Sequence, residues 1–158
     1  MYKNIVVTLD GSELSETAIE HAETIARGCQ NPQVILLRVI EPFMIPYTEA
    51  LTPGLTLPQM EQVEKDEKTK AEKYLDKIAA RMTVAGIKTS VKILYGLPAD
   101  TIIDFVDHNK IDLVIMATHG RSGFSRWIWG SVADKLLHGV CVPVLMVRVK
   151  GCGNLYKK

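Results

Sequence analysis

Several features that mark particular protein classes are absent from this sequence. Its 158 residues carry nearly equal numbers of basic and acidic side chains, which leaves a net charge of +1. That balance is not typical of a basic nucleic-acid binder or of an acidic disordered segment. No apolar run approaches the roughly 20 residues that span a bilayer, and the first residues lack a signal-peptide pattern. We therefore expect a soluble, cytoplasmic globular protein without a nucleic-acid or membrane partner.

Cysteine is also scarce, because the chain contains only Cys29, Cys141 and Cys152. An odd number at wide spacing fits neither a disulfide framework nor a zinc site. We expect reduced thiols, with Cys29 and Cys141 buried and Cys152 exposed near the end of the chain. The histidines lack the helical spacing to a second ligand and a carboxylate that would indicate a metal site held by the protein.

Two motifs of hydrolytic enzymes are missing as well. The chain has no Gly-x-x-x-x-Gly-Lys-Ser/Thr phosphate loop, and no lysine in its own glycine-rich segment counters charge on a γ-phosphate. Asp10, His119 and Ser131 supply the residue types of a nucleophilic triad, but no Gly-x-Ser-x-Gly elbow is present. A serine that opens a helix is usually its cap. We therefore assign no catalytic residue and do not expect efficient nucleotide hydrolysis.

The apolar residues that are present form short runs at 5–9, 34–39, 113–116 and 144–147. Continuous apolar runs are typical of parallel strands that are covered on both faces. Residues 87–93 instead alternate apolar with polar, which indicates an edge strand with one face toward water.

Helical patterns separate these strands. Ser12 or Asp10 can cap the first helix and Gly28 can close it, whereas the proline-rich residues 42–58 are expected to form a long loop. The four apolar stripes are Leu14, Ala18, Ala22 and Ile25; Ala71, Leu75, Ile78 and Met82; Ile102, Ile103 and Val106; and Val132, Leu136 and Leu137. Alternating strands and helices with right-handed crossovers favour a doubly wound, Rossmann-like α/β sheet with helices on both faces. We assign residues 1–150 to this domain and 151–158 to a short tail.

A glycine- and serine-rich segment, 117–131, lies between the fourth strand and the last helix. Its backbone N–H groups can surround an anion, and the helix N-terminus adds free donors and a positive dipole end, so the segment is suited to phosphate. Ligands of doubly wound sheets bind at the carboxyl ends of strands where the winding reverses. Asp10 follows the first strand and shares that edge if the two strands are neighbours. There it could accept hydrogen bonds from a ribose, help to hold a metal among phosphates, or merely cap the first helix.

Four segments, at 7–12, 34–39, 119–131 and 141–147, resemble the universal stress protein family in order and over nearly the whole chain. The resemblance implies a five-stranded sheet of order 3-2-1-4-5, homodimers, and membership of the ATP-binding branch. The nucleotide-binding signature of that branch is a glycine, two residues, a glycine, nine residues, and a glycine followed by serine or threonine. Gly120, Gly130 and Ser131 match it, whereas Ala117 replaces the first glycine. An alanine there costs little at negative φ, but it could crowd a nucleotide or strain a left-handed backbone.

The resemblance also implies a site for ATP, ADP or AMP with Mg²⁺. Val39 would lie beside adenine, and Asp10 is the possible metal contact. From the residues alone, Arg121 could meet phosphate or remain solvated. The site residues that we assign are Thr8, Asp10, Val39, Met116, Ala117, Gly120, Arg121, Ser122, Gly123, Gly130, Ser131 and Val132.

Three functions remain open from the sequence. The favoured one is a stress-response protein that binds an adenine nucleotide and acts as a sensor or signalling module, through a homodimer or an unknown protein partner, with slow or no hydrolysis. The alternatives are a structural or interaction protein of the same fold without nucleotide, and a weak ATPase. The strand from Val144 to Val147 is an apolar edge in the implied order, so we expect the homodimer to form through it.

Overall fold

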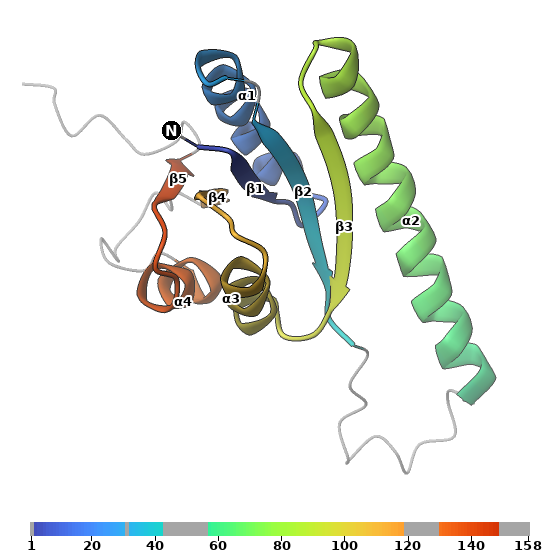
Figure 1. Ribbon diagram of the computed structural model, residues 1–158. Coiled ribbons are helices and arrows are strands. Elements are labelled where there is room, and N and C mark those ends of the chain that lie inside the picture. Colours follow the sequence, from blue (N-terminus) through green and yellow to red (C-terminus); the bar gives the residue numbers. More distant parts are fainter. Residues whose placement is uncertain (1, 31, 43–56, 119–129, 149–158) are drawn as a thin grey trace, which may run out of the picture.

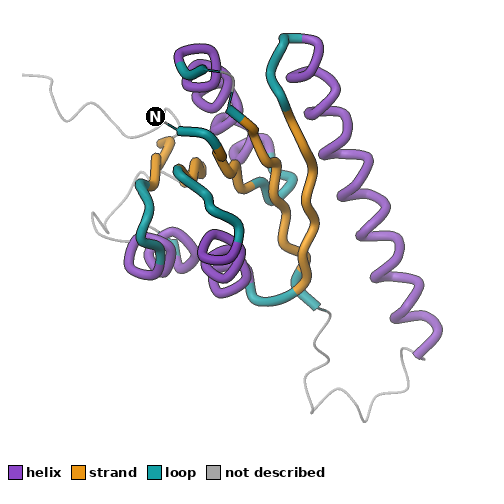
Figure 2. The backbone as a smooth tube through the Cα atoms, viewed as in Figure 1, coloured by secondary structure: helices purple, strands orange, loops and turns teal. Residues whose placement is uncertain are grey.

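The computed structural model describes residues 2–30, 32–42, 57–118 and 130–148, in which strands and helices alternate as predicted (Figures 1 and 2). The elements are β1 (Asn4–Thr8), α1 (Glu13–Gly28), β2 (Gln33–Ile40), α2 (Leu57–Val84), β3 (Thr89–Tyr95), α3 (Pro98–His108), β4 (Leu113–Thr118), α4 (Ser131–Gly139) and β5 (Val144–Arg148).

The strands form one parallel sheet in the order β3-β2-β1-β4-β5. Val7 in the central strand β1 lies opposite Leu36 of β2 on one side and Ile115 of β4 on the other. The chain winds from β1 to β3 in one direction and then returns across the sheet to β4 and β5 (Figure 1). The winding therefore reverses between β1 and β4, and the strand order implied by the family resemblance is confirmed.

Helices cover both faces of the sheet. Successive residues of β1 face opposite ways: Ile5 and Val7 pack in the core under α1 and α2, whereas Val6 packs in the core under α3 and α4. Figure 1 shows the same division of the helices into two layers. All three side chains are fully buried, and each such burial stabilises the fold by about 1.5–3 kcal/mol. Continuous apolar runs are required here because both faces of the central strands are covered.

The side chains of the two edge strands are less buried than those of the central strands. β3 alternates between half-buried and exposed side chains over most of its length, which confirms the predicted edge strand. β5 forms the opposite edge, and its first three side chains are half-buried. Within the described residues, β5 pairs only with β4.

The ends of the helices confirm two predictions and correct one. Ser12 is the cap of α1, because its Oγ accepts a hydrogen bond from the Ser15 amide at 3.1 Å. This helix ends at Gly28, as predicted, but Gly28 does not adopt the left-handed conformation of a glycine cap. Cys29 follows in extended conformation and donates its amide to Ile25 O at 3.0 Å, so no left-handed residue is needed. The loop predicted over 42–58 ends earlier, since α2 begins at Leu57 and the first turn of a helix accepts a proline; residues 43–56 lie outside the described residues.

Two burial predictions were also wrong. Cys29 is only half-buried and Cys141 is exposed, because both lie in connections between elements and not in the core; both thiols are free. Leu137 is exposed, since Ala133 and Leu136 are the residues of α4 that face the sheet. Cys152 lies outside the described residues.

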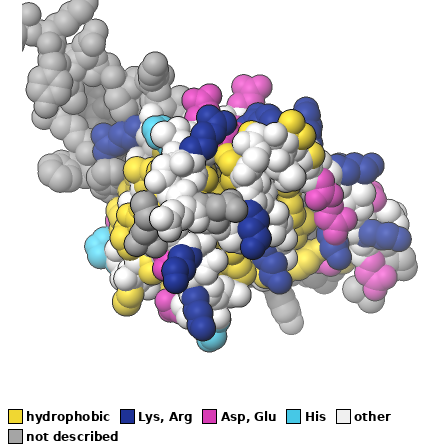
Figure 3. Space-filling view, turned by 45° about the horizontal axis from the view of Figure 1, so that its top comes forward, with side chains coloured by type: hydrophobic (Ala, Val, Ile, Leu, Met, Phe, Trp, Pro, Cys, Tyr) yellow, Lys and Arg dark blue, Asp and Glu magenta, His cyan; other side chains and the backbone are white. Residues whose placement is uncertain are grey.

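The surface carries charges of both signs. On the face shown in Figure 3, basic and acidic side chains are both present, with hydrophobic side chains between them. This mixture agrees with the nearly balanced net charge of the chain. Within the described ranges, no helix has the length and apolar composition needed to pass through a bilayer.

Candidate functional site

A cleft of about 470 Å³ lies at the carboxyl ends of β1, β2 and β4. This volume is within the range of small-molecule sites, and the position is where the winding of the sheet reverses. The described residues that line it are Thr8, Leu9, Asp10, Ser15, Leu37, Arg38, Val39, Ile40, Glu41, Glu67, Pro98, Ile102, Met116, Ala117 and Val132. Asp10 and the end of β4 therefore lie at the same edge of the sheet, as predicted.

The two sides of the cleft differ in chemistry because they belong to different faces of the sheet. Val39, Met116 and Ile102 belong to the core under α3 and α4 and make this side apolar. Ser15 of α1 and Glu67 of α2 lie on the other face and carry polar groups. The cleft therefore offers an apolar wall for a flat ring and a polar wall for hydroxyl or charged groups.

Asp10 lies between these walls in the turn from β1 to α1. Its Oδ1 accepts hydrogen bonds from the Ser12 amide at 2.8 Å and from Ser12 Oγ at 2.6 Å. Partial burial opposes ionisation, but these hydrogen bonds outweigh it and lower the pKa of Asp10 below its ordinary value. Asp10 therefore supports the helix cap through Oδ1, whereas Oδ2 accepts no hydrogen bond from the described residues. The capping role leaves one carboxylate oxygen available to a ligand.

Ala117, which departs from the family signature, lies in β4 opposite Val147 of β5. Its backbone does not have a positive φ, so an alanine causes no strain at this position. The side chain is half-buried and packs against the core under α1 and α2 while it lines the cleft. Alanine in place of the signature glycine therefore causes no backbone strain, and its one remaining possible effect is to crowd a bound nucleotide.

Gly130 precedes α4 with φ of +87° and ψ of 142° and has no side chain to cap the helix. This conformation is close to a region that is essentially restricted to glycine. Ser131 is the first residue of α4 and is exposed. Its neighbour Val132 lines the cleft, whereas Ser131 does not. The first turn of α4 thus presents backbone N–H groups without a side-chain cap beside the cleft.

The assigned residues Gly120, Arg121, Ser122 and Gly123 lie outside the described residues, as does His119. Of the other eight, Thr8, Asp10, Val39, Met116, Ala117 and Val132 line the cleft, whereas Gly130 and Ser131 adjoin it along α4.

Sequence reasoning did not identify Arg38, Ser15, Glu41 or Glu67 as lining residues. Arg38 could have been identified from the sequence, because it is a charged residue within the otherwise apolar run 34–39 of a buried strand. Its guanidinium carbon lies 5.8 Å from the centre of the Tyr74 ring, within the range of a cation–π contact. Ser15 and Glu67 carried no such signal, because their approach to the cleft depends on how α1 and α2 cross the sheet.

Sheet order and cleft position together define a doubly wound α/β protein whose site lies where the winding reverses. Within this class, the sequence matches the universal stress protein family over residues 1–148. The chain therefore belongs to the universal stress protein family, as its segments had indicated.

Comparison with known proteins agrees with this assignment. Universal stress protein MJ0531 of Methanocaldococcus jannaschii is 32% identical over 151 residues, which are 94% of this chain and 83% of that protein. The solved structure of MJ0577, from the same organism, has a TM-score of 0.77 at 25% identity and covers 96% of this chain and 99% of its own. A universal stress protein solved in complex with cAMP has a TM-score of 0.66 at 23% identity, with coverage of 93% and 97%. An Arabidopsis thaliana family member with AMP bound has a TM-score of 0.66 at 18% identity, with coverage of 94% and 93%.

Proposed function

We propose that this protein binds an adenine nucleotide, ATP, ADP or AMP, in the cleft at the carboxyl ends of β1, β2 and β4. The observation that carries this proposal is one cleft with an apolar wall, a carboxylate oxygen of Asp10 and an uncapped helix N-terminus beside it. These three features suit the base, the ribose and the phosphates of one nucleotide in turn. The structures solved with cAMP and with AMP share the fold, which supports the same class of ligand here.

The assigned residues divide among these parts of the ligand. Adenine lies against Val39 and Met116 on the apolar wall, and the ribose hydroxyls donate to Asp10, near Thr8. The phosphates accept hydrogen bonds from backbone N–H groups at the start of α4. The residues proposed for the phosphate end are Ala117, Gly120, Arg121, Ser122, Gly123, Gly130, Ser131 and Val132.

Mg²⁺ would arrive with the phosphates. Among the residues that the structure describes, no three His, Cys, Asp or Glu side chains are grouped to hold a metal by themselves. Mg²⁺ commonly takes one or two carboxylates, substrate phosphates and several waters, so a single carboxylate fits this role. The alternative to the ribose contact is therefore that Asp10 Oδ2 serves as a ligand for a metal that the nucleotide brings, where it would neutralise phosphate charge.

We propose that the nucleotide is held and not turned over rapidly, and that its occupancy is signalled through a homodimer formed by β5. The described lining residues of the cleft include no lysine, and Arg38 lies beside Tyr74 on the face of the sheet opposite to α4, so neither counters charge that develops on a γ-phosphate held at α4. ATP turnover should be far below the roughly 1–10³ s⁻¹ of ordinary enzymes.

Filling the apolar wall tests this proposal. Val39 is half-buried and lines the cleft, so Val39→Trp should occupy the space of the base and abolish ATP binding in isothermal titration calorimetry. Val63→Trp is the control, because it adds the same bulk at an exposed position of α2. Binding by the parent and the control, but not by Val39→Trp, supports the proposal. A parent protein that binds no adenine nucleotide and copurifies with none would contradict it and favour an interaction protein of the same fold.

A further inference from the structure

Arg38 is held in a defined place on the polar side of the cleft. It is the charged residue of β2 and is half-buried. The Tyr74 ring lies 5.8 Å from its guanidinium carbon. On another side the guanidinium lies against Gly11, where a Cβ atom would come within 2.8 Å of Nη1. Gly11 has φ of +89°, so glycine provides both the turn and the space for this cation.

The hydrogen-bonding capacity of Arg38 is not used by the residues that the structure describes. Arginine has five N–H donors, and in this structure the guanidinium has neither a hydrogen bond nor an ion pair with a described residue. A planar fork of donors that is already positioned loses little freedom when an acceptor binds. The preferred acceptors of such a fork are the oxygens of a phosphate or a carboxylate.

Neighbouring carboxylates do not fill this role. Glu67 lines the same cleft, but its Oε1 accepts a hydrogen bond from Lys70 at 2.9 Å, which compensates its charge. Asp10 Oδ1 accepts a hydrogen bond from Ser12 Oγ, and Glu41 is exposed. None of these carboxylates lies within ion-pair distance of Arg38. The positive charge of Arg38 is therefore open to an incoming anion.

We infer that Arg38 forms a subsite for a phosphate carried on the ribose of the bound nucleotide, in addition to its 5′-phosphate. This inference rests on the proposed function, which positions the ribose at Asp10. Gly11 follows Asp10 directly, so the guanidinium that lies against Gly11 is beside the ribose position. The 5′-phosphates are assigned to α4, whose core lies under the other face of the sheet. The ligand class is an adenosine bisphosphate with one phosphate on the 2′- or 3′-oxygen.

The test compares ligands that differ by one ribose phosphate. Titration calorimetry would measure AMP, adenosine 3′,5′-bisphosphate and adenosine 2′,5′-bisphosphate against the parent protein. A hydrogen-bonded charge pair should make one bisphosphate bind at least about tenfold more tightly than AMP. The isomer that gains affinity identifies which ribose oxygen carries the phosphate.

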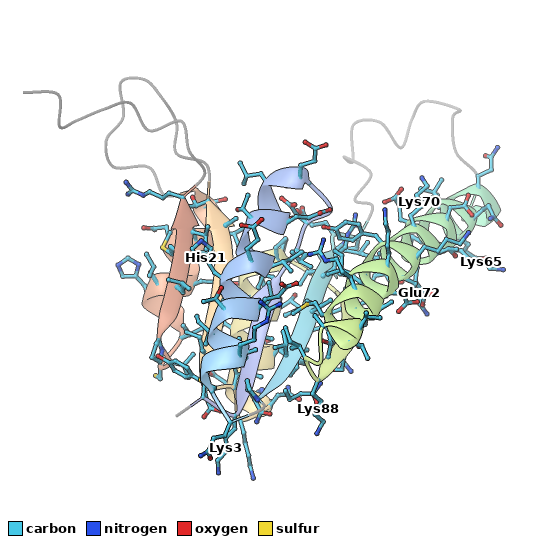
Figure 4. All side chains as sticks on the ribbon, turned by 90° about the horizontal axis from the view of Figure 1, so that it is seen from above. Lys3, His21, Lys65, Lys70, Glu72 and Lys88 are labelled. Carbon is cyan, nitrogen blue, oxygen red and sulfur yellow. The ribbon has the colours of Figure 1, made fainter. Side chains whose placement is uncertain are left out.

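Variants assign the gain to Arg38. Arg38→Gln removes the charge and should lower the affinity for the bisphosphate to that for AMP, both measured on the same variant. Arg38→Lys should keep part of the preference for the bisphosphate, because lysine supplies a point charge without the fork. Lys88→Gln is the matched control. Lys88 precedes β3 at the amino end of the sheet, on the same side as Lys3 (Figure 4), whereas the cleft lies at the carboxyl ends of the strands. Thermal unfolding would confirm that each variant is folded.

The possible failures are distinguishable. If the parent binds AMP but neither bisphosphate more tightly, the subsite is refuted while the proposed function stands. If Arg38→Gln keeps the preference for the bisphosphate, the phosphate is bound elsewhere and the assignment to Arg38 is wrong. If no adenine nucleotide binds the parent, both the proposed function and this inference are overturned.

Discussion

A negative charge at residue 130 should strongly weaken nucleotide binding. Gly130 stands directly before α4, where the proposed phosphates meet the uncapped N–H groups of the first turn. Gly130→Asp places a carboxylate at the cap position, where it accepts those same N–H groups and repels the phosphates. The variant therefore removes the donors and adds an opposing charge in one step.

The size of the effect follows from Coulomb's law. Two unit charges 4 Å apart near a protein surface interact by about 4 kcal/mol. Mg²⁺ on the nucleotide neutralises part of the phosphate charge, so we expect about 3 kcal/mol of lost binding, or roughly a 100-fold weaker ATP affinity.

Backbone strain must be separated from charge in this experiment. Any side chain at φ of +87° and ψ of 142° is strained, at a cost of about 1–3 kcal/mol. Gly130→Asn has the same shape and the same strain without the charge, so it is the matched control. Calorimetry with Mg·ATP should show a much weaker affinity for the Asp variant than for the Asn variant, at similar unfolding temperatures. Equal affinities for the two variants would refute the placement of phosphates at α4.

Three further outcomes are expected. Ala117→Gly should leave ATP affinity unchanged, because Ala117 has an unstrained φ, and should cost about 0.5–1 kcal/mol of stability; a clear gain in affinity by calorimetry would show instead that the methyl group crowds the ligand. Met146→Lys should convert a dimer to a monomer in light scattering, since it puts a charge on the apolar edge strand β5; a parent that is already monomeric at micromolar concentration would contradict dimerisation through β5. Asp112 accepts hydrogen bonds from the amides of Asn4 and Lys3 at 2.8 and 2.9 Å, which lower its pKa. Its stabilising effect is therefore present above the unfolded pKa of about 3.9 and is lost as the pH falls through the lower folded pKa, so Asp112→Asn should reduce the unfolding temperature at pH 7 and have little effect at pH 2. A deficit that is independent of pH would contradict that origin.

The fold was largely readable from the sequence, because its central strands have to be apolar on both faces. Val6 and Val7 are adjacent, point to opposite cores and are both fully buried, so an uninterrupted apolar run was a reliable signal. Helix ends were less predictable. α1 does end at Gly28, but the chain leaves it in extended conformation without a left-handed glycine, and α2 begins at Leu57 within the predicted loop.

The candidate site was predictable only where local sequence determines it. Asp10 and Gly130 were identified because a strand end and a helix start fix their positions. Ser15 and Glu67 reach the cleft because of how α1 and α2 pack on the sheet, which depends on contacts between distant segments. Arg38 could have been recognised as a polar interruption in a buried strand, yet only the structure shows that no described residue forms a hydrogen bond or an ion pair with it.

Helix α2 is much longer than the strand that follows it. Its 28 residues extend over about 42 Å, whereas the seven residues of β3 span about 23 Å. The N-terminal half of α2 therefore projects beyond the carboxyl ends of β2 and β3 (Figure 1). Burial in the core begins only at Ala71, and the preceding turns are supported by side-chain pairs within the helix, such as that of Lys70 with Glu67.

This difference divides α2 into two regions of unequal local stability. Backbone amides after Ala71 should exchange with deuterium only when the domain unfolds globally, whereas those of residues 59–70 should exchange through fraying of the helix. Glu67 lies in the fraying region and also lines the cleft. A ligand that contacts this wall would therefore slow exchange along the projecting half of α2, so the helix would report the occupancy of the cleft over several turns.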